Sequence, residues 1–584
     1  MQKKIKSAIL CSYIRFGGIS IKKIVLTTLN SKYIHSSLSP WCLRAGVKEY
    51  SCTSFDCEVI EGTVNEDISL FAQKIIDKKP DIIGFSIYIW NKKKTYSLIE
   101  IIKNELRDVP LVAGGPEVAY NPCEVLSENK NIDYILSGEG EYPFAALADR
   151  LANSEDISGI CGLSFRKNGE IISNEPYISN DDPPSPYSAE YLSNLNGRIA
   201  YLETSRGCPY SCAFCLSGRC ENVRFFDVEK SKQNMLLLAN SGAKTIKLLD
   251  RTFNADRKRA KEIFSFIISE YGKRIPIGVC FHFEISGELL DEETLSLLSE
   301  APRGAIQFEI GIQSFNPQTL QSINRRSETS KLKENIKSLL KRKNIHIHID
   351  LIAGLPYEDL KSFENSFDEA YFLGSDMLQL GFLKLLHGAP MRENTDKYPC
   401  EFSEAPPYEV LSTPWLSETD LQELHFAEIA LDKLYNSSRF NITLDHLMSN
   451  SPYTPYKFFN KFGKYIAAEK KERCSLDELI NTLYDFLLND GKTDIAILRD
   501  KMMRDRLANS STGVIPERIR INDEKLLKIK KYLQADPALA PNLATKRSIA
   551  ILYTENSAIF ADYCDSEKEN GKYKIHEISL DIIK

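Results

Sequence analysis

Continuous apolar runs alternate with amphipathic stretches along the first 155 residues. Short apolar runs are typical of buried strands, and apolar spacings of three and four residues are typical of helices. The expected strands lie at 22–28, 56–64, 81–91, 109–118 and the start of 132–144, and the expected helices at 39–50, 68–77 and 95–106. Because the strands do not alternate with polar residues, they predict a parallel sheet with helices on both faces.

Residues 151–197 interrupt this rhythm. The stretch 162–175 predicts a hairpin that turns at Asn168 and Gly169, a pair of residue types that favours a tight turn. The Pro-rich stretch 181–186 predicts an extended linker. We therefore expect a domain boundary near 180–195.

The alternation of strand and helix resumes at Arg198 and continues to about residue 386. The expected strands lie at 198–205, 245–254, 276–285, 305–314, 345–356 and 377–386. Six such units predict a doubly wound sheet or a partial barrel, with ligands at the carboxyl ends of the strands. Beyond Pro407 the pattern is mostly helical, at 417–436, 455–468 and 475–506, and short strands are expected within 547–563 and 572–580.

Composition limits the class of protein. The chain has 584 residues, 74 Lys and Arg against 80 Asp and Glu, and a net charge of −6. This length predicts about two to four domains, and this charge excludes a strongly basic nucleic-acid protein. We expect no membrane span, and no signal peptide because Arg15 interrupts the apolar N-terminal stretch. The expected compartment is the cytoplasm.

Fourteen cysteines are present, and four of them fall within 13 residues: Cys208, Cys212, Cys215 and Cys220. The other ten are expected to be small buried side chains. The first three form C-x3-C-x2-C on a loop that follows a strand. Three thiolates can bind three irons of a [4Fe–4S] cluster and leave the fourth iron open to a substrate. The alternatives are a structural zinc site with Cys220 as fourth ligand, or no metal.

The loop Ser205–Cys215 resembles the signature of radical S-adenosylmethionine (SAM) enzymes, in the branch that includes cobalamin-binding members. The resemblance implies that Cys208, Cys212 and Cys215 bind the cluster and that Phe214 packs near the adenine of S-adenosylmethionine. It assigns no role to Cys220. In this family the open iron chelates S-adenosylmethionine, and one electron cleaves it to a 5′-deoxyadenosyl radical, which abstracts a substrate hydrogen.

Three downstream segments resemble the same family, and the resemblance covers about 195–400. It implies that the segment 247–254 ends close to the methionyl group and that the segment 308–314 points two polar side chains into the barrel. It also places the backbone of 348–359 near the adenine. The implied cofactor-binding residues are Leu249, Asp250, Arg251, Glu309, Gln313, Gly354, Leu355 and Pro356. The alternative for each acidic residue is a hydrogen-bonded core group.

Residues 21–155 resemble the cobalamin-binding domain that precedes many radical SAM domains. Glycines fall at the ends of two expected strands, where a flat corrin needs close approach of the backbone: Gly114, Gly115, Gly138 and Gly140. A nucleotide-binding fold is the rival interpretation, but G-x-G-x-x-G does not follow the first strand. The D-x-H-x-x-G motif is also missing, because residue 33 is Tyr before His35. This departure implies a cobalt without a His ligand, or a domain that has lost its cofactor.

Several other polar residues lie on expected strands. His346 and His348 alternate on one strand, where satisfied imidazoles are favoured over a metal site. His282 and Glu284 share one face of a strand, as cavity lining or as ordinary core groups. His387 follows the last strand and is a candidate to approach the substrate.

Together these observations predict an α/β protein with a Rossmann-like cobalamin-binding domain, a radical SAM partial (β/α)6 TIM barrel and a mostly helical C-terminal domain. The expected boundaries are 1–20 for an extension, 21–155, 156–197 for the hairpin and linker, 198–400 and 401–584. The expected cofactors are a [4Fe–4S] cluster, S-adenosylmethionine and cobalamin. An electron donor such as flavodoxin or ferredoxin is expected, in a reducing and largely anaerobic cell, and no nucleic-acid module is evident.

The predicted function is a cobalamin-assisted radical reaction, C-methylation of an unknown substrate. By analogy, methylcobalamin donates the methyl group and a second S-adenosylmethionine regenerates it. The alternatives are a rearrangement or cyclisation, or an iron–sulfur protein that senses redox state or cobalamin without catalysis. Methylthio transfer to tRNA is disfavoured, because extra N-terminal cluster cysteines and a basic RNA module are not evident.

Overall fold

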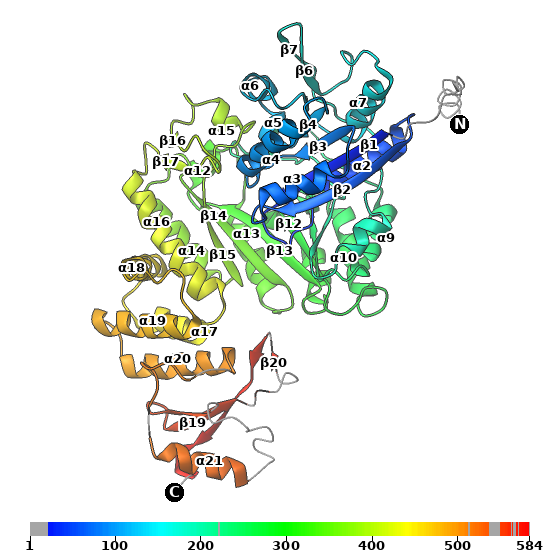
Figure 1. Ribbon diagram of the computed structural model, residues 1–584. Coiled ribbons are helices and arrows are strands. Elements are labelled where there is room, and N and C mark those ends of the chain that lie inside the picture. Colours follow the sequence, from blue (N-terminus) through cyan, green and yellow to red (C-terminus); the bar gives the residue numbers. More distant parts are fainter. Residues whose placement is uncertain are drawn as a thin grey trace. The chain divides into compact units, whose positions relative to one another are not determined.

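The computed structural model describes residues 22–219, 222–511, 514–521, 523–535, 549–561, 563, 568–569 and 571–582 (Figure 1). The predicted extension at 1–20 and Cys220 lie outside the described residues. The described chain forms two compact units. The first contains the residues up to Gly311, Gln321–His346 and Leu383–Leu411, and the second contains Ile312–Leu320, Ile347–Phe382 and the residues from Ser412.

The first unit begins with a seven-stranded sheet in the order β2-β1-β3-β4-β5-β6-β7. Its strands are β1 (Lys22–Asn30), β2 (Phe55–Thr63), β3 (Ile82–Ser86), β4 (Leu111–Gly114), β5 (Tyr134–Leu136), β6 (Leu163–Lys167) and β7 (Glu170–Ser173). The first five strands are parallel, as predicted. The predicted hairpin is β6–β7, which adds antiparallel to β5 and so extends this sheet.

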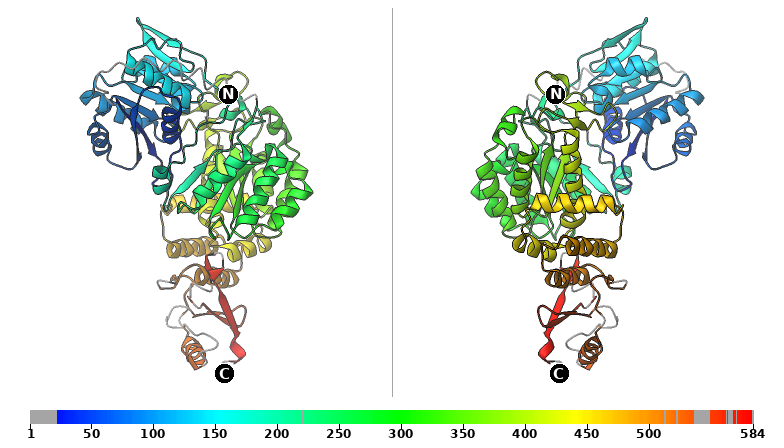
Figure 2. Two further views of the ribbon diagram at one scale, coloured as in Figure 1. Left: turned by 90° about the vertical axis from the view of Figure 1, so that its right-hand side faces the viewer. Right: turned by 90° about the vertical axis from the view of Figure 1, so that its left-hand side faces the viewer.

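Helices cover both faces of this sheet (Figures 1 and 2). On one face α3 (Ile68–Ile76) and α4 (Lys92–Glu105) bury an apolar cluster that includes Phe71 and Leu98. On the other face α2 (Ser39–Tyr50) and α7 (Glu141–Asn153) bury a second cluster around Phe144. Because both faces of the sheet are covered, the strands β1, β3 and β4 have consecutive buried residues that face both sides. The short helices here are α5 (Pro116–Ala119), α6 (Pro122–Glu128) and α8 (Ala189–Ser193).

Two of these strands end earlier than the sequence predicts. The strand expected at 81–91 ends at Ser86, because a turn follows in which the Tyr88 amide donates to the side chain of Asn91. The buried Asn91 side chain in turn donates to the carbonyl of Leu29 on β1. The strand expected at 109–118 ends at Gly114, and the next residue turns the chain into α5.

Six strands form a second sheet in the order β15-β14-β13-β12-β11-β8. They are β8 (Ile199–Leu202), β11 (Thr245–Leu248), β12 (Cys280–Ile285), β13 (Ile306–Gln313), β14 (His346–Ala353) and β15 (Met377–Phe382). The helices between them include α9 (Val228–Ala239), α10 (Arg257–Glu270), α11 (Glu292–Ser299), α12 (Pro317–Ser322), α13 (Thr329–Leu340) and α14 (Leu360–Phe372). The six predicted strands and their order confirm the partial (β/α)6 barrel.

Within the first unit, the strands of this second sheet have one apolar and one polar face. Ala200, Leu202, Ile246, Leu248, Phe281, Phe283, Ile306 and Phe308 are buried on one face. The alternate positions carry Tyr201, Lys247, His282, Glu284 and Glu309. Tyr201, Lys247 and His282 occupy neighbouring register positions, as do Glu284 and Glu309. The polar groups therefore form rows across one face of the sheet.

The C-terminal region of the second unit is mostly helical, as predicted. Its helices are α16 (Glu418–Leu431), α17 (Asn441–Asn450), α18 (Pro455–Ala468), α19 (Leu476–Asp490), α20 (Ile495–Asn509) and α21 (Lys525–Ala535). The antiparallel strands β18 (Ile549–Leu552), β19 (Ser557–Ala561) and β22 (Ile575–Ser579) form a small sheet. Among the described residues, no helix is both long and apolar enough to cross a membrane.

Candidate functional site

The three predicted cluster ligands lie on one loop after the short strand β9 (Ser205–Arg206). Cys208 and Cys212 are buried, Cys215 is half-buried, and all three are free thiols. The amide of Cys215 donates to the carbonyl of Cys212 at 3.1 Å, which folds the loop back on itself. Burial raises the pKa of the Cys212 thiol, and the neighbouring Arg325 guanidinium opposes this shift.

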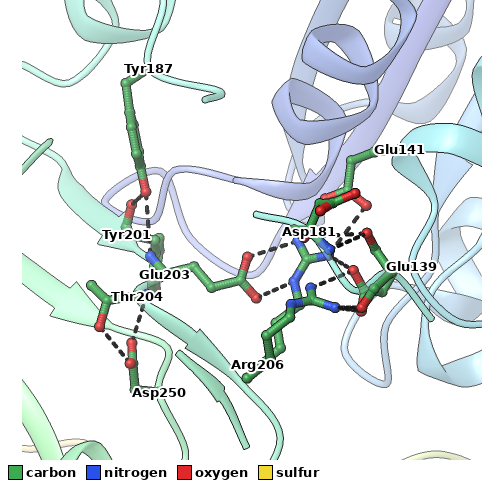
Figure 3. Close-up of polar contacts among 11 residues, drawn as sticks. Glu139, Glu141, Asp181, Tyr187, Tyr201, Glu203, Thr204, Arg206 and Asp250 are labelled. Carbon is green, nitrogen blue, oxygen red and sulfur yellow. Dashed lines mark hydrogen bonds and ion pairs between the residues drawn. The ribbon is translucent and has the colours of Figure 1, made fainter. Parts of the chain in front are cut away.

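Asp250 holds the beginning of this loop in place (Figure 3). It is 1% exposed and follows β11, and its carboxylate accepts hydrogen bonds from the amide of Thr204, the hydroxyl of Thr204 and the hydroxyl of Ser205 at 2.6–3.0 Å. Burial raises the pKa of Asp250, and these three donors oppose the shift. Its neighbour Leu249 is half-buried. The predicted cofactor contact at Asp250 is therefore also an anchor for the cysteine loop.

The far side of the loop is held by backbone and by one arginine. The amide of Ala213 donates to Ile323, and the amide of Met391 donates to the carbonyl of Ala213. The Nη1 of Arg325 lies 3.8 Å from the sulfur of Cys212, and the Nη2 of the same guanidinium donates to the carbonyl of Gly311. Sequence reasoning missed Arg325, which lies twelve residues after Gln313 and outside the segment 308–314.

Glu309 takes part in a charged network on the polar face of the barrel sheet. Its carboxylate lies 3.0 Å from Lys247 Nζ and 2.8 Å from His282 Nε2, and Lys247 lies 3.6 Å from Glu284. Burial lowers the pKa of Lys247, but Glu309 and Glu284 outweigh it, and the net shift is upward. His282 thus has a carboxylate partner on the strand face for which cavity lining and ordinary core packing were both left open.

The second unit contains the other predicted contacts, Gln313, Gly354 and Leu355. Gln313 has a φ of +72° and is 9% exposed, and its side-chain oxygen has no hydrogen-bond partner among the described residues. Gly354 also has a positive φ and Leu355 is fully buried. A strained residue with an unpaired buried oxygen is a common sign of a ligand contact.

The glycines of the N-terminal domain have different surroundings. A Cβ on Gly115 would lie 2.4 Å from the carbonyl oxygen of Ile87, and one on Gly138 would lie 2.2 Å from that of Tyr177. Both residues have positive φ, so the chain's own backbone already requires glycine there. Gly140 faces the side chain of Leu43 at 2.8 Å. Gly114 is the least crowded of the four, because a Cβ there would lie 3.8 Å from its nearest neighbour, the carbonyl oxygen of Leu136.

His35 does not stand free on the loop after β1. Its Nδ1 lies 2.7 Å from the hydroxyl of Tyr201, which belongs to the polar face of the barrel sheet. Burial and the charges of Lys32 and Lys247 lower the pKa of His35. This contact supports the expectation that a cobalt bound in the domain has no ligand from His35.

Three family models match consecutive parts of the chain. They are described as "B12 binding domain" for residues 24–148, "Radical SAM superfamily" for residues 202–370 and "Protein of unknown function (DUF4080)" for residues 396–572. The chain is a B12-binding radical SAM protein with a DUF4080 domain. The predicted family, the radical SAM enzyme class and the three predicted cofactors are thereby confirmed.

Curated relatives match a little over half of the chain. "Uncharacterized methyltransferase PH0819" of Pyrococcus horikoshii is 28% identical over 340 residues, 56% of this chain and 71% of that protein. "Cobalamin-dependent radical SAM methyltransferase TokK" of Streptomyces tokunonensis is 26% identical over 345 residues, 55% of this chain and 49% of that protein. The chain thus spans about half the length of the second relative.

A solved structure shows the same fold. The cobalamin-dependent S-adenosylmethionine radical enzyme OxsB with aqua-cobalamin bound has a TM-score of 0.60 to this chain at 16% identity. The likeness covers 88% of this chain and 86% of OxsB.

The residues present fit the expected cofactors. The loop offers three free thiols, one for each of three irons of a [4Fe–4S] cluster. Among the described residues, no group of three or more His, Cys, Asp or Glu surrounds a single point as the ligands of one metal ion would. For S-adenosylmethionine, Gln313 offers an unpaired buried acceptor within the described chain. For cobalamin, a Cβ on Gly114 at the carboxyl end of β4 would make only an ordinary contact of 3.8 Å with the carbonyl oxygen of Leu136, and the stacked rings of Tyr88 and half-exposed Trp90 follow β3.

Proposed function

We propose that this protein is a cobalamin-dependent radical SAM methyltransferase that transfers a methyl group to an unactivated carbon of its substrate. The observation that carries the proposal is the cysteine loop: three free thiols in C-x3-C-x2-C, anchored between the core domain and the B12-binding domain within one compact unit. The names of the two curated relatives support methyl transfer over other radical reactions.

The chemistry divides between the cofactors and the chain. When bound, the cluster supplies the electron that cleaves S-adenosylmethionine, and cobalamin carries the methyl group. The chain's own residues bind and orient these groups. Cys208, Cys212 and Cys215 hold the cluster, and Arg325 places a positive charge beside one of its sulfurs. We assign Phe214, Leu249, Gln313, Gly354 and Leu355 to S-adenosylmethionine, and Gly114 to cobalamin.

The substrate lies, in this proposal, against the polar face of the barrel sheet. Lys247, Glu284 and Glu309 are each about a quarter exposed there, so they remain accessible to a ligand. These groups favour a substrate with hydrogen-bonding substituents over a purely apolar one. A flavodoxin or ferredoxin is the proposed electron donor.

The test begins with anaerobic reconstitution of the full chain with iron, sulfide and cobalamin. On reduction with S-adenosylmethionine, we expect bound corrin, about four irons per chain and 5′-deoxyadenosine. Cys212→Ala should abolish 5′-deoxyadenosine, whereas Cys52→Ala, more than 150 positions before the loop, should leave it unchanged. The expectation that the scattered cysteines are buried is wrong for Cys52, Cys123 and Cys161, which are exposed.

Three outcomes would contradict the proposal. Folded protein that retains no corrin would remove cobalamin from it. Bound iron without any 5′-deoxyadenosine would favour the non-catalytic iron–sulfur protein. In extracts from the native host, a product that gains no deuterium from S-adenosylmethionine labelled in its methyl group would favour rearrangement or cyclisation.

A further inference from the structure

A cluster of five charged side chains joins the cysteine loop to the B12-binding domain (Figure 3). We call it the clamp; it consists of Arg206, Arg224, Glu139, Glu141 and Glu203. Arg206 Nε and Nη2 donate to the two carboxylate oxygens of Glu203 at 2.9 and 2.8 Å. The same guanidinium donates to Glu141 at 2.6 Å and to Glu139. Arg224 donates to both oxygens of Glu139 at 2.9 and 2.7 Å.

The clamp is shielded from water. Its side chains are 8–21% exposed, far less than ordinary surface ion pairs. Burial raises the pKa of Glu139, but the two arginines outweigh it and the net shift is downward. The planar fork of arginine fits two carboxylates at once, and lysine does not reproduce this geometry. The clamp therefore fixes the orientation of its side chains in addition to pairing their charges.

The position of the clamp in the chain connects the two predicted cofactor sites. Arg206 is separated from Cys208 only by Gly207, whose φ is +101° and whose Cβ position lies 2.2 Å from the carbonyl oxygen of Asn222. Arg206 also pairs with Arg224 where β9 lies antiparallel to β10 (Arg224–Phe225). On the other side, Glu139 lies in the loop after β5, and Glu141 begins α7.

We propose that Arg206 is a positioning residue that sets the placement of the iron–sulfur cluster relative to cobalamin. This inference rests on the proposed function, because it requires both groups to bind. The connection is short. A shift of the Arg206 guanidinium is transmitted to Cys208 through Gly207 alone, whose backbone is restricted by close packing against Asn222. A general stabilising contact between the two domains would lack this direct route to the cluster.

Arg198 provides a matched control. Its guanidinium donates to Glu61 on β2 at 2.8 Å and to the carbonyls of Tyr33 and His35. The side chains of Arg198 and Glu61 are 10% and 11% exposed, so this pair is at least as buried as the clamp. It also joins the B12-binding domain to the core domain, but it precedes β8 instead of following it. Arg198→Lys thus weakens the same domain contact away from the cysteines.

The experiment compares wild type, Arg206→Lys and Arg198→Lys as full chains reconstituted with iron, sulfide and cobalamin. The first readout is the magnetic interaction between the reduced cluster and cob(II)alamin in the electron paramagnetic resonance spectrum, which depends on their separation and orientation. We expect Arg206→Lys to change this interaction and Arg198→Lys to preserve it, with equal iron and corrin contents. Cleavage of S-adenosylmethionine should fall about tenfold or more in Arg206→Lys, as for a small misplacement of reacting groups.

The second readout is hydrogen exchange of the peptides that cover the cysteine loop, measured by mass spectrometry. We expect faster exchange in Arg206→Lys than in Arg198→Lys. The inference is overturned if the two variants exchange equally, or if Arg206→Lys exchanges faster but keeps the wild-type spin interaction. Wild type that binds no corrin or forms no 5′-deoxyadenosine would instead overturn the proposed function, and the exchange comparison would still decide whether the clamp holds the loop.

Discussion

At the scale of single residues, Gln313 departs most from ordinary backbone and packing. Its positive φ costs free energy for a residue with a side chain, and its buried oxygen lacks a partner among the described residues. Such strain persists only where the surrounding structure or a ligand compensates for it. The sequence motif predicted a cofactor contact at this residue, but only the structure shows the strain.

Gln313→Gly separates strain from binding. Glycine adopts positive φ freely, so we expect thermal stability to be unchanged or slightly higher. Loss of the side-chain oxygen should raise the dissociation constant for S-adenosylmethionine about tenfold, the worth of one good hydrogen bond. Equilibrium dialysis on the iron-reconstituted protein measures the second effect. Unchanged affinity would remove Gln313 from the binding site.

Asp250→Asn tests the anchor of the cysteine loop. The replacement has the same shape, but an amide nitrogen faces donors where a carboxylate oxygen accepted them. We expect a loss of roughly 1–3 kcal/mol, seen as a lower melting temperature, together with faster loss of iron during gel filtration. Asp256→Asn is a suitable control, since it alters a carboxylate that caps the start of α10 by accepting from the amide of Arg259. Equal iron retention in the two variants would contradict the anchoring role.

Sequence reasoning at this scale found the cysteines but not their supports. Arg206 lay inside the recognised motif and Glu139 inside the glycine-rich loop, yet neither residue type alone indicates a partner 67 positions away. The carboxylate of Asp250 was expected at the cofactor, and its three donors come from a loop 45 residues earlier. Partners of this kind are set by tertiary packing, which local pattern does not encode.

At the scale of elements, the glycine loops of the B12-binding domain combine two functions. Gly115 and Gly138 permit close packing of the chain on itself, whereas a Cβ on Gly114 would make only an ordinary contact of 3.8 Å. The sequence marked all four glycines alike, because glycine spacing does not distinguish a tight turn from a ligand cradle.

Alanine substitutions distinguish these glycines. Gly138→Ala should destabilise the domain by roughly 1–3 kcal/mol, because it combines positive φ with a 2.2 Å contact to backbone. Gly114→Ala should leave the melting temperature within a few degrees but reduce the corrin retained after gel filtration. Corrin absorbance and circular dichroism measure the two effects. A stable Gly114→Ala protein with full corrin would exclude Gly114 as a contact.

The junction between β13, β14 and α14 contains a carboxyl with an unusual environment. Glu358 is fully buried and accepts hydrogen bonds from Ser314 and Ser366 at 2.6 and 3.0 Å. Burial raises its pKa to about 7, although these hydroxyls oppose the shift. The folded state therefore keeps a proton that the unfolded chain loses near pH 4.5.

This carboxyl gives the stability of the protein a predictable pH dependence. Because the folded state binds the extra proton, stability should fall as pH rises from about 4.5 to about 7, by roughly 3 kcal/mol in total, and then level off. Glu358→Gln removes this contribution. Melting temperatures of both proteins between pH 5 and 8 provide the test, and parallel curves would contradict it. Asp505, whose pKa burial raises to about 6, acts equally in both proteins.

Most elements of both sheets could be predicted from the sequence, because their hydrophobic runs are long and regular. The ends of β3 and β4 could not be predicted. After β3, for example, the apolar run continues past Ser86, although the side chain of Asn91 closes a turn there. The polar face of the barrel sheet could also be predicted only in part from the sequence. Charged residues such as Lys247 and Glu309 are isolated in the sequence, and strand register brings them together.

At the scale of the whole molecule, the second unit joins barrel strands to the C-terminal helices. Asn436 donates to and accepts from the backbone of Leu378, and so pairs with β15 as a neighbouring strand would. The rings of Tyr456 and Phe459 pack on Phe367 of α14. The C-terminal region thus belongs to the same apolar core as the last two barrel strands.

Truncation after Leu411 should therefore produce an aggregating protein and not a smaller enzyme. It removes the partners of Phe367 and exposes the edge of β15, which can pair with other chains. We expect most of the truncated protein in the insoluble fraction, and full-length Asn436→Ala to remain soluble with a melting temperature lowered by a few degrees. A soluble, monomeric truncated chain on gel filtration would contradict this view of the second unit.

The anchoring of the cysteine loop bears on how the protein matures. Asp250 and the clamp restrain the loop through groups that do not include iron, so the loop loses its conformational entropy when the chain folds and not when metal arrives. The cluster is then inserted into a loop that is already folded, whereas zinc fingers fold only when they bind their metal. A protein built this way can lose its cluster to oxygen, keep its fold and be repaired by a new round of iron–sulfur assembly.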